Sequence, residues 1–413
     1  MTTILFIHGT GVRDAGINEY LEQLRRGVQR IRGEVTVHAT RWGDIVGASL
    51  LAGGASIPAD LLRQRSEVAA LRTLVEPGPE DSQLALWEIM DTAPLVELDA
   101  LSSASRVAHP ARDEQTARTV VDRLGRALEP GTDLHGKLAN AGLGPTAMAA
   151  ATQLVASDQF TDIVENPQLG IEQKAACLAR AFTALALGLR DAELGCLAPV
   201  DGQHREAVEL AAAQAVAHPD VPPGAIQPQL KGIILDRVLS LVTNWAARNR
   251  VRLTQEAATG IGDTLKYLSR GRALRQLIGQ DLDAIEDDEV IVVAHSLGAV
   301  ACLDLLIDNR HPKVGMLVAV ATQSGLLFEL DALPSQRFAK GYQLPQDFPA
   351  THFVYDPRDL LAYKSGGLFG PGITDHRIDN RAPFPRNHGA YFTNDAFYEL
   401  LDRILPRRGE PGR

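Results

Sequence analysis

The sequence predicts an α/β protein in which a mostly parallel sheet is interrupted by a large helical insertion. Residues 290–293 are four consecutive apolar, mostly β-branched residues, as in a fully buried strand, and a turn of small residues leads from them into a helical segment at 299–307. Residues 4–7 form a second buried-type strand. Between these two regions, residues 45–228 are rich in alanine and leucine and follow a helical period.

The first 44 residues predict a strand, a helix and a second strand. After the strand at 3–7, Asp14–Arg32 carries apolar side chains at spacings of three and four, which predicts an amphipathic helix. Val35–Arg41 is the second strand. Two strands joined by a helix in this way form a right-handed parallel crossover.

The central segment predicts a helical subdomain. Residues 45–228 are too long for a loop, so we expect them to be inserted into a core made of residues 1–44 and 229–413. The subdomain suits either a cap that shapes a substrate pocket or a platform for self-association or a partner, and its first residues, Val46–Ser56, suit either a lid or tight helix packing. Six helices are expected in it, at residues 60–75, 82–103, 113–128, 144–157, 171–193 and 203–217.

An α/β pattern returns after residue 229. Leu230–Arg248 has an amphipathic stripe, and a further helix is expected to run from its cap at Asp263 to about Leu282. A closing helix covers Asp395–Ile404, and the residues after it have the character of a disordered tail. Besides the strand at 290, three more strands are expected, at residues 314–321, 351–355 and 372–378.

The composition argues against several classes of function. The chain has 413 residues and a formal net charge of -10, which disfavours a nucleic-acid partner and adsorption to anionic membranes by charge alone. The three cysteines have no metal-ligand spacing and suggest no disulfide framework. We find no signal peptide before the first strand and no apolar run long enough to span a bilayer. A cytoplasmic protein is therefore expected, while specialised export, peripheral membrane contact and the oligomeric state stay open.

The segment around Ser296 predicts a nucleophile. A strand, a sharp turn with a central serine and a helix form the nucleophile elbow, whose G-x-S-x-G pattern here has Ala294 in place of the first glycine. Because the serine backbone is strained in such a turn, we expect the small residues Ala294 and Gly298 to pack against each other. The alternative is a strand-to-helix turn that merely contains a serine.

A second motif, His8-Gly9-Thr10-Gly11, follows the first strand. An acyl-transfer site needs two N–H donors aimed at the developing oxyanion. One donor would be the backbone N–H of Leu297, and the other would come from this loop, because its glycines let the backbone approach the substrate. Two such motifs in one chain favour catalysis over chance.

Together these motifs resemble the α/β-hydrolase family, and the chain is similar to lipase-like bacterial serine esterases with large helical insertions. The resemblance covers about residues 1–44 and 250–405 and leaves the middle unexplained. It implies an α/β-hydrolase fold without the two usual leading strands, and catalytic residues in the order serine, acid, histidine. It also implies that Thr10 and Leu297 form the oxyanion hole.

The resemblance also indicates which histidine is the catalytic base. His388 lies in the loop between the last strand and the closing helix, where the base of the family resides, and it begins a His-x-x-Tyr pattern like that of the family. His352 and His376 lie inside strands, and His311 lies at a helix end before a proline.

Two carboxylates qualify as the acid, because both follow the strand at 351–355. The resemblance favours Asp359, which precedes an apolar-apolar-Ala step as in the loop of the family. Asp356 then forms the turn ahead of Pro357.

The remaining assignments concern a substrate pocket. His8 is expected to pack behind the glycine loop and His295 to lie beside the nucleophile without being the base. With Leu326 and Leu327 they are assigned to the pocket, although leucines at such a position are more often plain core. No cluster has metal-ligand spacing, and the glycine loop lacks the third glycine of a dinucleotide fingerprint, so we expect no metal or cofactor.

The sequence thus predicts a serine hydrolase that cleaves carboxylic esters, small or lipidic, through an acyl-enzyme. An acyltransferase or thioesterase with the same triad stays open, and a hydrolase-fold scaffold that binds through its insertion is the alternative of another class. The apolar insertion favours esters of medium or longer acyl chains.

Overall fold

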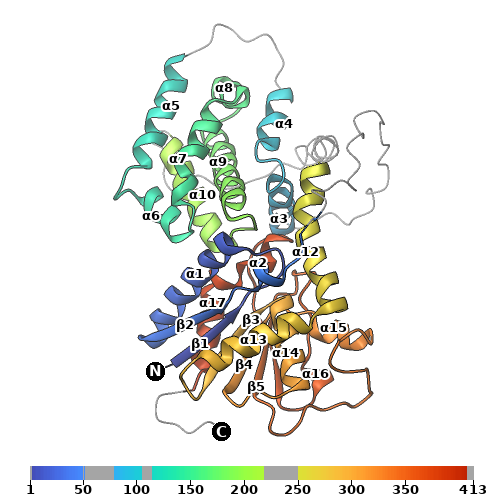
Figure 1. The fold of residues 1–413 in the computed structure, drawn as a ribbon. Coiled ribbons are helices and arrows are strands. Elements are labelled where there is room, and N and C mark those ends of the chain that lie inside the picture. Colours follow the sequence, from blue (N-terminus) through green and yellow to red (C-terminus); the bar gives the residue numbers. More distant parts are fainter. Residues whose placement is uncertain (1, 50, 52–78, 105–113, 218–249, 407–413) are drawn as a thin grey trace. The chain divides into compact units, whose positions relative to one another are not determined.

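The computed structural model describes residues 2–49, 51, 79–104, 114–217 and 250–406. Its described residues contain a single sheet of six parallel strands in the order β2-β1-β3-β4-β5-β6, which confirms the predicted α/β class and its parallel sheet (Figure 1). The strands are β1 (Thr2–Ile7), β2 (Val35–Thr40), β3 (Val290–His295), β4 (Val314–Val320), β5 (Ala350–Tyr355) and β6 (Ile373–Arg377).

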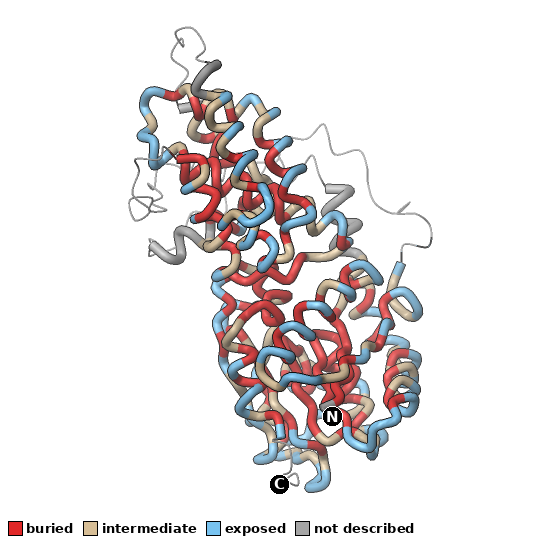
Figure 2. The backbone as a smooth tube through the Cα atoms, turned by 90° about the vertical axis from the view of Figure 1, so that its left-hand side faces the viewer, coloured by how far each residue is buried: buried red, intermediate tan, exposed pale blue. Residues whose placement is uncertain are grey.

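Helices cover both faces of this sheet, so its central strands are buried on both sides. Every residue of β3 is buried, as its continuous apolar sequence predicts. One face packs against α1 (Asp14–Arg32) and α17 (Asp395–Ile404), and the other against α13 (Arg272–Ala284) and α14 (Leu297–Asp308). Figure 2 shows the buried residues concentrated along the strands and the helix sides that face them.

The helix expected to begin at Asp263 is two helices, and the predicted cap is wrong. The first is α12 (Arg250–Arg270) and the second is α13, with Gly271 between them. Asp263 therefore lies inside a helix, where it has no capping role. A Cβ at Gly271 would lie 2.6 Å from the carbonyl oxygen of Tyr267, so the glycine allows the close approach at the junction.

The described residues divide between two compact units. Unit 1 comprises 1–57, 194–201 and 252–413, and unit 2 comprises 58–193 and 202–251. Residues 194–201 belong to unit 1 because Cys196 packs on the core beneath α1 and Asp201 N donates to Thr393 Oγ1 (3.0 Å). Unit 1 also contains α2 (Trp42–Val46), α15 (Ser324–Glu329), α16 (Gly366–Phe369), η2 (Arg386–His388) and η3 (Ala390–Phe392).

Unit 2 is helical throughout its described residues, and none of them joins the sheet. The single helix expected at 82–103 is two helices, and two short helices at 133–140 and 158–165 were not anticipated. The helices expected at 60–75 and 230–248 lie outside the described residues, as do residues 52–56. The helices are α3 (Pro79–Met90), α4 (Val96–Ala104), α5 (Glu114–Ala127), α6 (Asp133–Asn140), α7 (Gly144–Val155), α8 (Asp158–Glu165), α9 (Ile171–Leu194) and α10 (Gly202–Val216).

A buried ion cluster ties these helices together. Arg180 of α9 donates to both carboxylate oxygens of Glu97 (2.6 and 2.8 Å) and to Glu209 of α10 (3.3 Å). Two carboxylates therefore surround a guanidinium whose side chain is 6% exposed, so its charge is compensated.

None of the helices in the described part of the chain combines the length and the apolar sequence that a membrane-spanning helix needs.

Candidate active site

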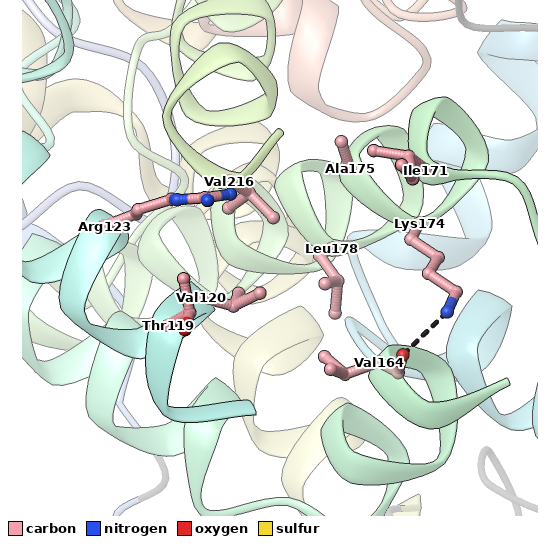
Figure 3. A pocket seen from close by; sticks show the side chains of 9 residues that line it. All are labelled: Thr119, Val120, Arg123, Val164, Ile171, Lys174, Ala175, Leu178 and Val216. Carbon is pink, nitrogen blue, oxygen red and sulfur yellow. Dashed lines mark hydrogen bonds between the residues drawn. The ribbon is translucent and has the colours of Figure 1, made fainter. Parts of the chain in front are cut away.

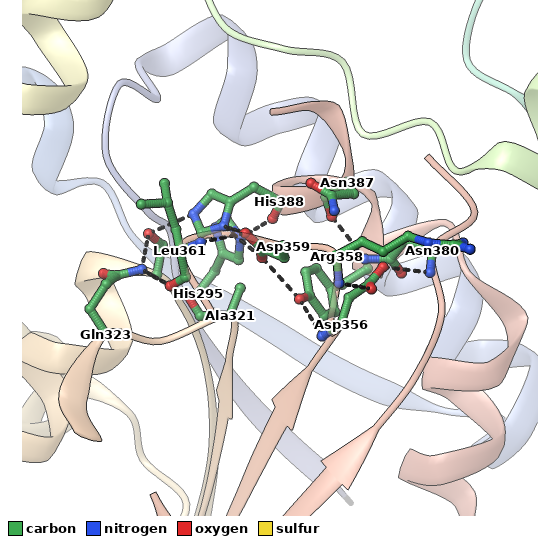
Figure 4. Close-up of polar contacts among 12 residues, drawn as sticks. His295, Ala321, Gln323, Asp356, Arg358, Asp359, Leu361, Asn380, Asn387 and His388 are labelled. Carbon is green, nitrogen blue, oxygen red and sulfur yellow. Dashed lines mark hydrogen bonds and ion pairs between the residues drawn. The ribbon is translucent and has the colours of Figure 1, made fainter. Parts of the chain in front are cut away.

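The site lies where β1, β3, β4, β5 and β6 end, at the carboxyl edge of the parallel sheet. Because the strands are parallel, the loops that follow them meet at this edge, which is where open α/β sheets hold their sites. These loops bring together side chains that are far apart in the sequence: His388 lies 92 positions after Ser296 and 29 positions after Asp359. Figure 4 shows the polar contacts that result.

Ser296 occupies a strained turn between β3 and α14. Its φ of 52° and ψ of -124° lie in a region that side-chain-bearing residues rarely adopt. The strain is held by packing and by the bond from Ser296 N to Val320 O of β4 (2.8 Å). The closest neighbour of Gly298 is not Ala294, as predicted, but the end of β1. A Cβ at Gly298 would lie 2.4 Å from the carbonyl oxygen of His8 and 2.7 Å from that of Ile7, so only glycine fits beside this strand.

His388 connects the serine to a carboxylate. Its Nε2 lies 2.9 Å from Ser296 Oγ, and its Nδ1 lies 2.8 and 3.0 Å from the two carboxylate oxygens of Asp359. With Nδ1 protonated and donating to the carboxylate, Nε2 is free to accept the serine proton. The arrangement can therefore activate the hydroxyl and stabilise the imidazolium that forms.

Of the two candidate acids, Asp359 reaches the histidine. Its carboxylate also accepts from Leu361 N (3.0 Å) and from the Tyr391 hydroxyl (3.0 Å), and three donors hold a negative charge in a side chain that has no exposed surface. Asp356 accepts instead from the backbone N–H groups of Arg358 and Asn380 (both 2.8 Å), which shapes the turn, and burial raises the pKa of its carboxyl.

Tyr391 stiffens this arrangement from behind. Its hydroxyl donates to Asp359 and accepts from the backbone N–H of Asp356 (2.9 Å), so it fixes the acid relative to the end of β5. Burial, followed by the charge of Asp359, raises the pKa of Tyr391 well above its usual value. The phenol therefore remains a donor at neutral pH.

His295 supports the base and does not compete with it. Its Nε2 lies 2.7 Å from the backbone carbonyl oxygen of His388, so the neutral ring donates there and fixes the backbone of the base. Burial lowers the pKa of His295 to about 3, with a smaller contribution from His388. Its side chain is thus a neutral bridge between β3 and the segment that carries His388.

The glycine loop lies against the nucleophile. A Cβ at Gly9 would lie 2.8 Å from Ser296 Cβ and 2.7 Å from His295 Nδ1, so only glycine fits. Thr10, the next residue, is thereby brought to the site, while the N–H of Leu297 is the first of α14 and has no partner within that helix. These are the two backbone groups assigned to the oxyanion hole.

Asp263, which was misassigned from the sequence, anchors this loop. Its carboxylate accepts from Gly11 N (2.8 Å) and Ala48 N (2.5 Å) and forms a two-point ion pair with Arg13 (3.1 Å for both bonds). The loops after β1 and β2 are therefore tied to α12. No sequence pattern marks this role, because its partners are mostly backbone groups more than 200 residues away.

His8 packs behind the same loop. Its ring stacks on Trp42 at 4.7 Å between centroids, Nδ1 lies 2.8 Å from Gly9 O, and Nε2 accepts from Gly43 N (3.3 Å). Burial lowers the pKa of His8 to about 4, so the ring is neutral. With 1% of its surface exposed, it supports the loop and offers no face to solvent.

Gln323 is a further residue of the site that the sequence did not single out. Its Nε2 donates to Ala321 O (3.0 Å) and Leu361 O (2.7 Å) and lies 3.4 Å from Ser296 Oγ, so it joins the end of β4 to the loop of the acid beside the nucleophile. In the sequence, only its position just after a strand end marks it as a residue of the site.

Leu326 and Leu327, which were assigned to the pocket, lie on α15. Both are half-buried, and Leu327 packs against the core.

The other three histidines after Ser296 lie elsewhere. His352 and His376 contact each other across β5 and β6 (3.0 Å), and His311 contacts Asp283 (3.2 Å). In the described part of the chain, no group of three or more His, Cys, Asp or Glu side chains could hold a metal ion.

Comparisons of the chain with protein-family models, with curated proteins and with solved structures find no match. The interpretation of the site therefore depends on its geometry.

The buried histidines predict an acid-sensitive fold. An unfolded histidine takes up a proton below about pH 6.5, whereas His295 stays neutral down to about pH 3, so the unfolded state binds more protons in this window. We expect the free energy of unfolding to fall on acidification from pH 6.5 to 5, by up to about 1.4 kcal/mol per pH unit for each such histidine.

Urea denaturation at several pH values measures this dependence. His295→Gln keeps an N–H donor for the His388 carbonyl but does not titrate, so its slope should be shallower than that of the wild type. His38→Gln, at an exposed position, is the matched control. Equal slopes in wild type and His295→Gln would refute the neutral role of His295.

Proposed function

We propose that this chain is a serine hydrolase of the α/β-hydrolase type that cleaves carboxylic esters. One observation carries the proposal: Ser296 Oγ, on a strained strand-to-helix turn, lies 2.9 Å from His388 Nε2, while the buried carboxylate of Asp359 holds Nδ1. A serine hydroxyl needs this pairing to become a nucleophile, and structural packing alone does not require it.

In the proposed reaction, His388 takes the proton of Ser296 as Oγ attacks the ester carbonyl. The backbone N–H groups of Thr10 and Leu297 hold the oxyanion of the tetrahedral intermediate. The intermediate collapses, and the alcohol leaves with the proton from His388. Water then attacks the acyl-enzyme, with His388 taking its proton, and the carboxylic acid is released as His388 returns the proton to Ser296 Oγ. The carboxylate of Asp359 orients His388 and stabilises the imidazolium.

The topology supports the hydrolase type. The nucleophile follows β3, which has two strands on one side and three on the other, and the acid and base follow β5 and β6 in the order serine, acid, histidine. Relative to that family the sheet begins at the strand that precedes the oxyanion loop, so two leading strands have no counterpart among the described residues.

Apolar surface beside the triad supports an apolar ester as the substrate. Leu360 and Leu361, directly after Asp359, are 65% and 41% exposed. Gln323 Nε2 donates to the carbonyl oxygen of Leu361 and also lies 3.4 Å from Ser296 Oγ, so this segment lies beside the serine. Exposed leucines at this position suit an acyl chain or an apolar alcohol better than a charged group. We therefore propose esters of medium or longer acyl chains, including lipid esters.

Product analysis and turnover measurements distinguish ester hydrolysis from two other functions. An acyltransferase or thioesterase would use the same triad with another acceptor or leaving group, and product analysis with added alcohols or with thioesters separates these from ester hydrolysis. A hydrolase-fold scaffold that binds through its helical unit would leave the triad without turnover.

Removal of the nucleophile tests the proposal. Ser296→Ala deletes a single hydroxyl, and we expect it to lower kcat/KM for a p-nitrophenyl ester series of increasing chain length by several orders of magnitude. Ser269→Ala, on the exposed side of α12, is the matched control and should keep full activity. Undiminished turnover by Ser296→Ala would end the hydrolase proposal.

The two carboxylates give a second test. Asp359→Asn places an amide before His388 Nδ1 and favours the wrong tautomer, so we expect kcat to drop by about four orders of magnitude. Asp356→Asn loses one acceptor for a backbone N–H, so it should mainly lower the free energy of unfolding, by about 1–3 kcal/mol. Steady-state kinetics and urea denaturation of both variants measure these effects, and the reverse ranking in kcat would show that the acid is Asp356.

A further inference from the structure

Unit 2 contains a hollow that has no part in the Ser296 site. It lies between α5, α8, α9 and α10 and has a cavity volume of about 250 Å³ (Figure 3). Its walls are mostly aliphatic, with one threonine and two cationic side chains: Thr119, Val120, Arg123, Val164, Ile171, Lys174, Ala175, Leu178 and Val216.

Among the residues that the structure describes, no carboxylate pairs with the two cations of this hollow. Lys174 Nζ donates to the carbonyl oxygen of Val164 (2.7 Å), and Arg123 Nη1 donates to that of Ala217 (3.2 Å). In the part of the chain that the structure describes, neither forms an ion pair. A lysine has three donors and an arginine five, so both keep N–H groups for another acceptor. Burial lowers the pKa of Lys174, in keeping with a cation against apolar walls.

Another cation on the same helix, α9, is compensated by carboxylates of neighbouring helices. Arg180, six positions after Lys174 on α9, is held by Glu97 and Glu209. Carboxylates thus neutralise the guanidinium in the core of unit 2, whereas no described carboxylate neutralises the two cations at the hollow. Both cations at the hollow are only half-buried, and a cation beside apolar walls can bind an anionic ligand through charge-assisted hydrogen bonds.

We propose that this hollow binds an apolar carboxylate of medium chain length. The aliphatic walls receive the tail, and Lys174 or Arg123 receives the carboxylate through charge-assisted hydrogen bonds. At about 30 Å³ for each water-sized group, the volume holds roughly eight such groups, which is enough for the seven-carbon tail of octanoate when its carboxylate lies at the two cations. The formal net charge of the chain is -10, so anions are not drawn to it unspecifically, and binding depends on these two side chains.

Isothermal titration calorimetry of the full chain with octanoate tests the proposal. We expect saturable binding of octanoate, binding of octan-1-ol that is weaker by about tenfold or more, and no binding of octylammonium, because the two analogues lack the anion. Equal affinity for octanoate and octanol, or no saturable binding at millimolar octanoate, would overturn the proposal.

Variants locate the binding. Lys174→Met and Arg123→Met keep the aliphatic stems and should together weaken octanoate binding by at least about tenfold, while Val120→Phe should abolish it by filling the hollow with both cations in place. Arg126→Met, on the exposed side of α5, is the matched control and should bind as the wild type does. Thermal unfolding verifies that each variant is folded.

The test does not depend on the chemistry at Ser296. Ser296→Ala should bind octanoate as the wild type does, even if the chain proves to have no esterase activity. Octanoate binding that is unchanged in Lys174→Met, Arg123→Met and Val120→Phe belongs to another site, and this result would overturn the assignment.

Discussion

The site depends on one side chain, the imidazole of His388, which bridges Ser296 and Asp359. Its Nε2 lies 2.9 Å from Ser296 Oγ and its Nδ1 lies 2.8 Å from the nearer carboxylate oxygen of Asp359. The three residues come from three different loops. A shift of any one loop by about 1 Å would break one of these contacts. The sheet meets this constraint, because parallel strands deliver the ends of β3, β5 and β6 to one edge.

Polar residues outside the triad hold these loops in place. His295 ties the backbone of the base to β3, Tyr391 ties the acid to the end of β5, and Gln323 ties the acid loop to β4. Asp263 does the same for the glycine loop, through three partners at once. Burial keeps His295 neutral and Tyr391 protonated, so these supports do not change their charge where the triad would work.

The sequence predicts the parts of this arrangement that depend on local chemistry. Continuous apolar runs identify the buried strands, and the small residues around Ser296 identify the strained turn. Asp263 was misread because its partners, Gly11 and Ala48, are distant backbone groups that leave no pattern near it. For Gln323 the sequence offers only its position just after β4, which does not show that its side chain reaches Leu361 O. The break at Gly271 is not predicted because a single glycine is tolerated inside many helices. The resemblance to hydrolases separated Asp359 from Asp356, which local sequence alone left open.

The most direct test of the account is covalent labelling by a fluorophosphonate, which reacts with a serine only when a base activates it. The account predicts stoichiometric labelling of the native chain, mapped by mass spectrometry of the digested protein to the peptide that contains Ser296, and strongly reduced labelling in His388→Ala. Labelling that maps to another serine, or a native folded chain that is not labelled, would contradict it.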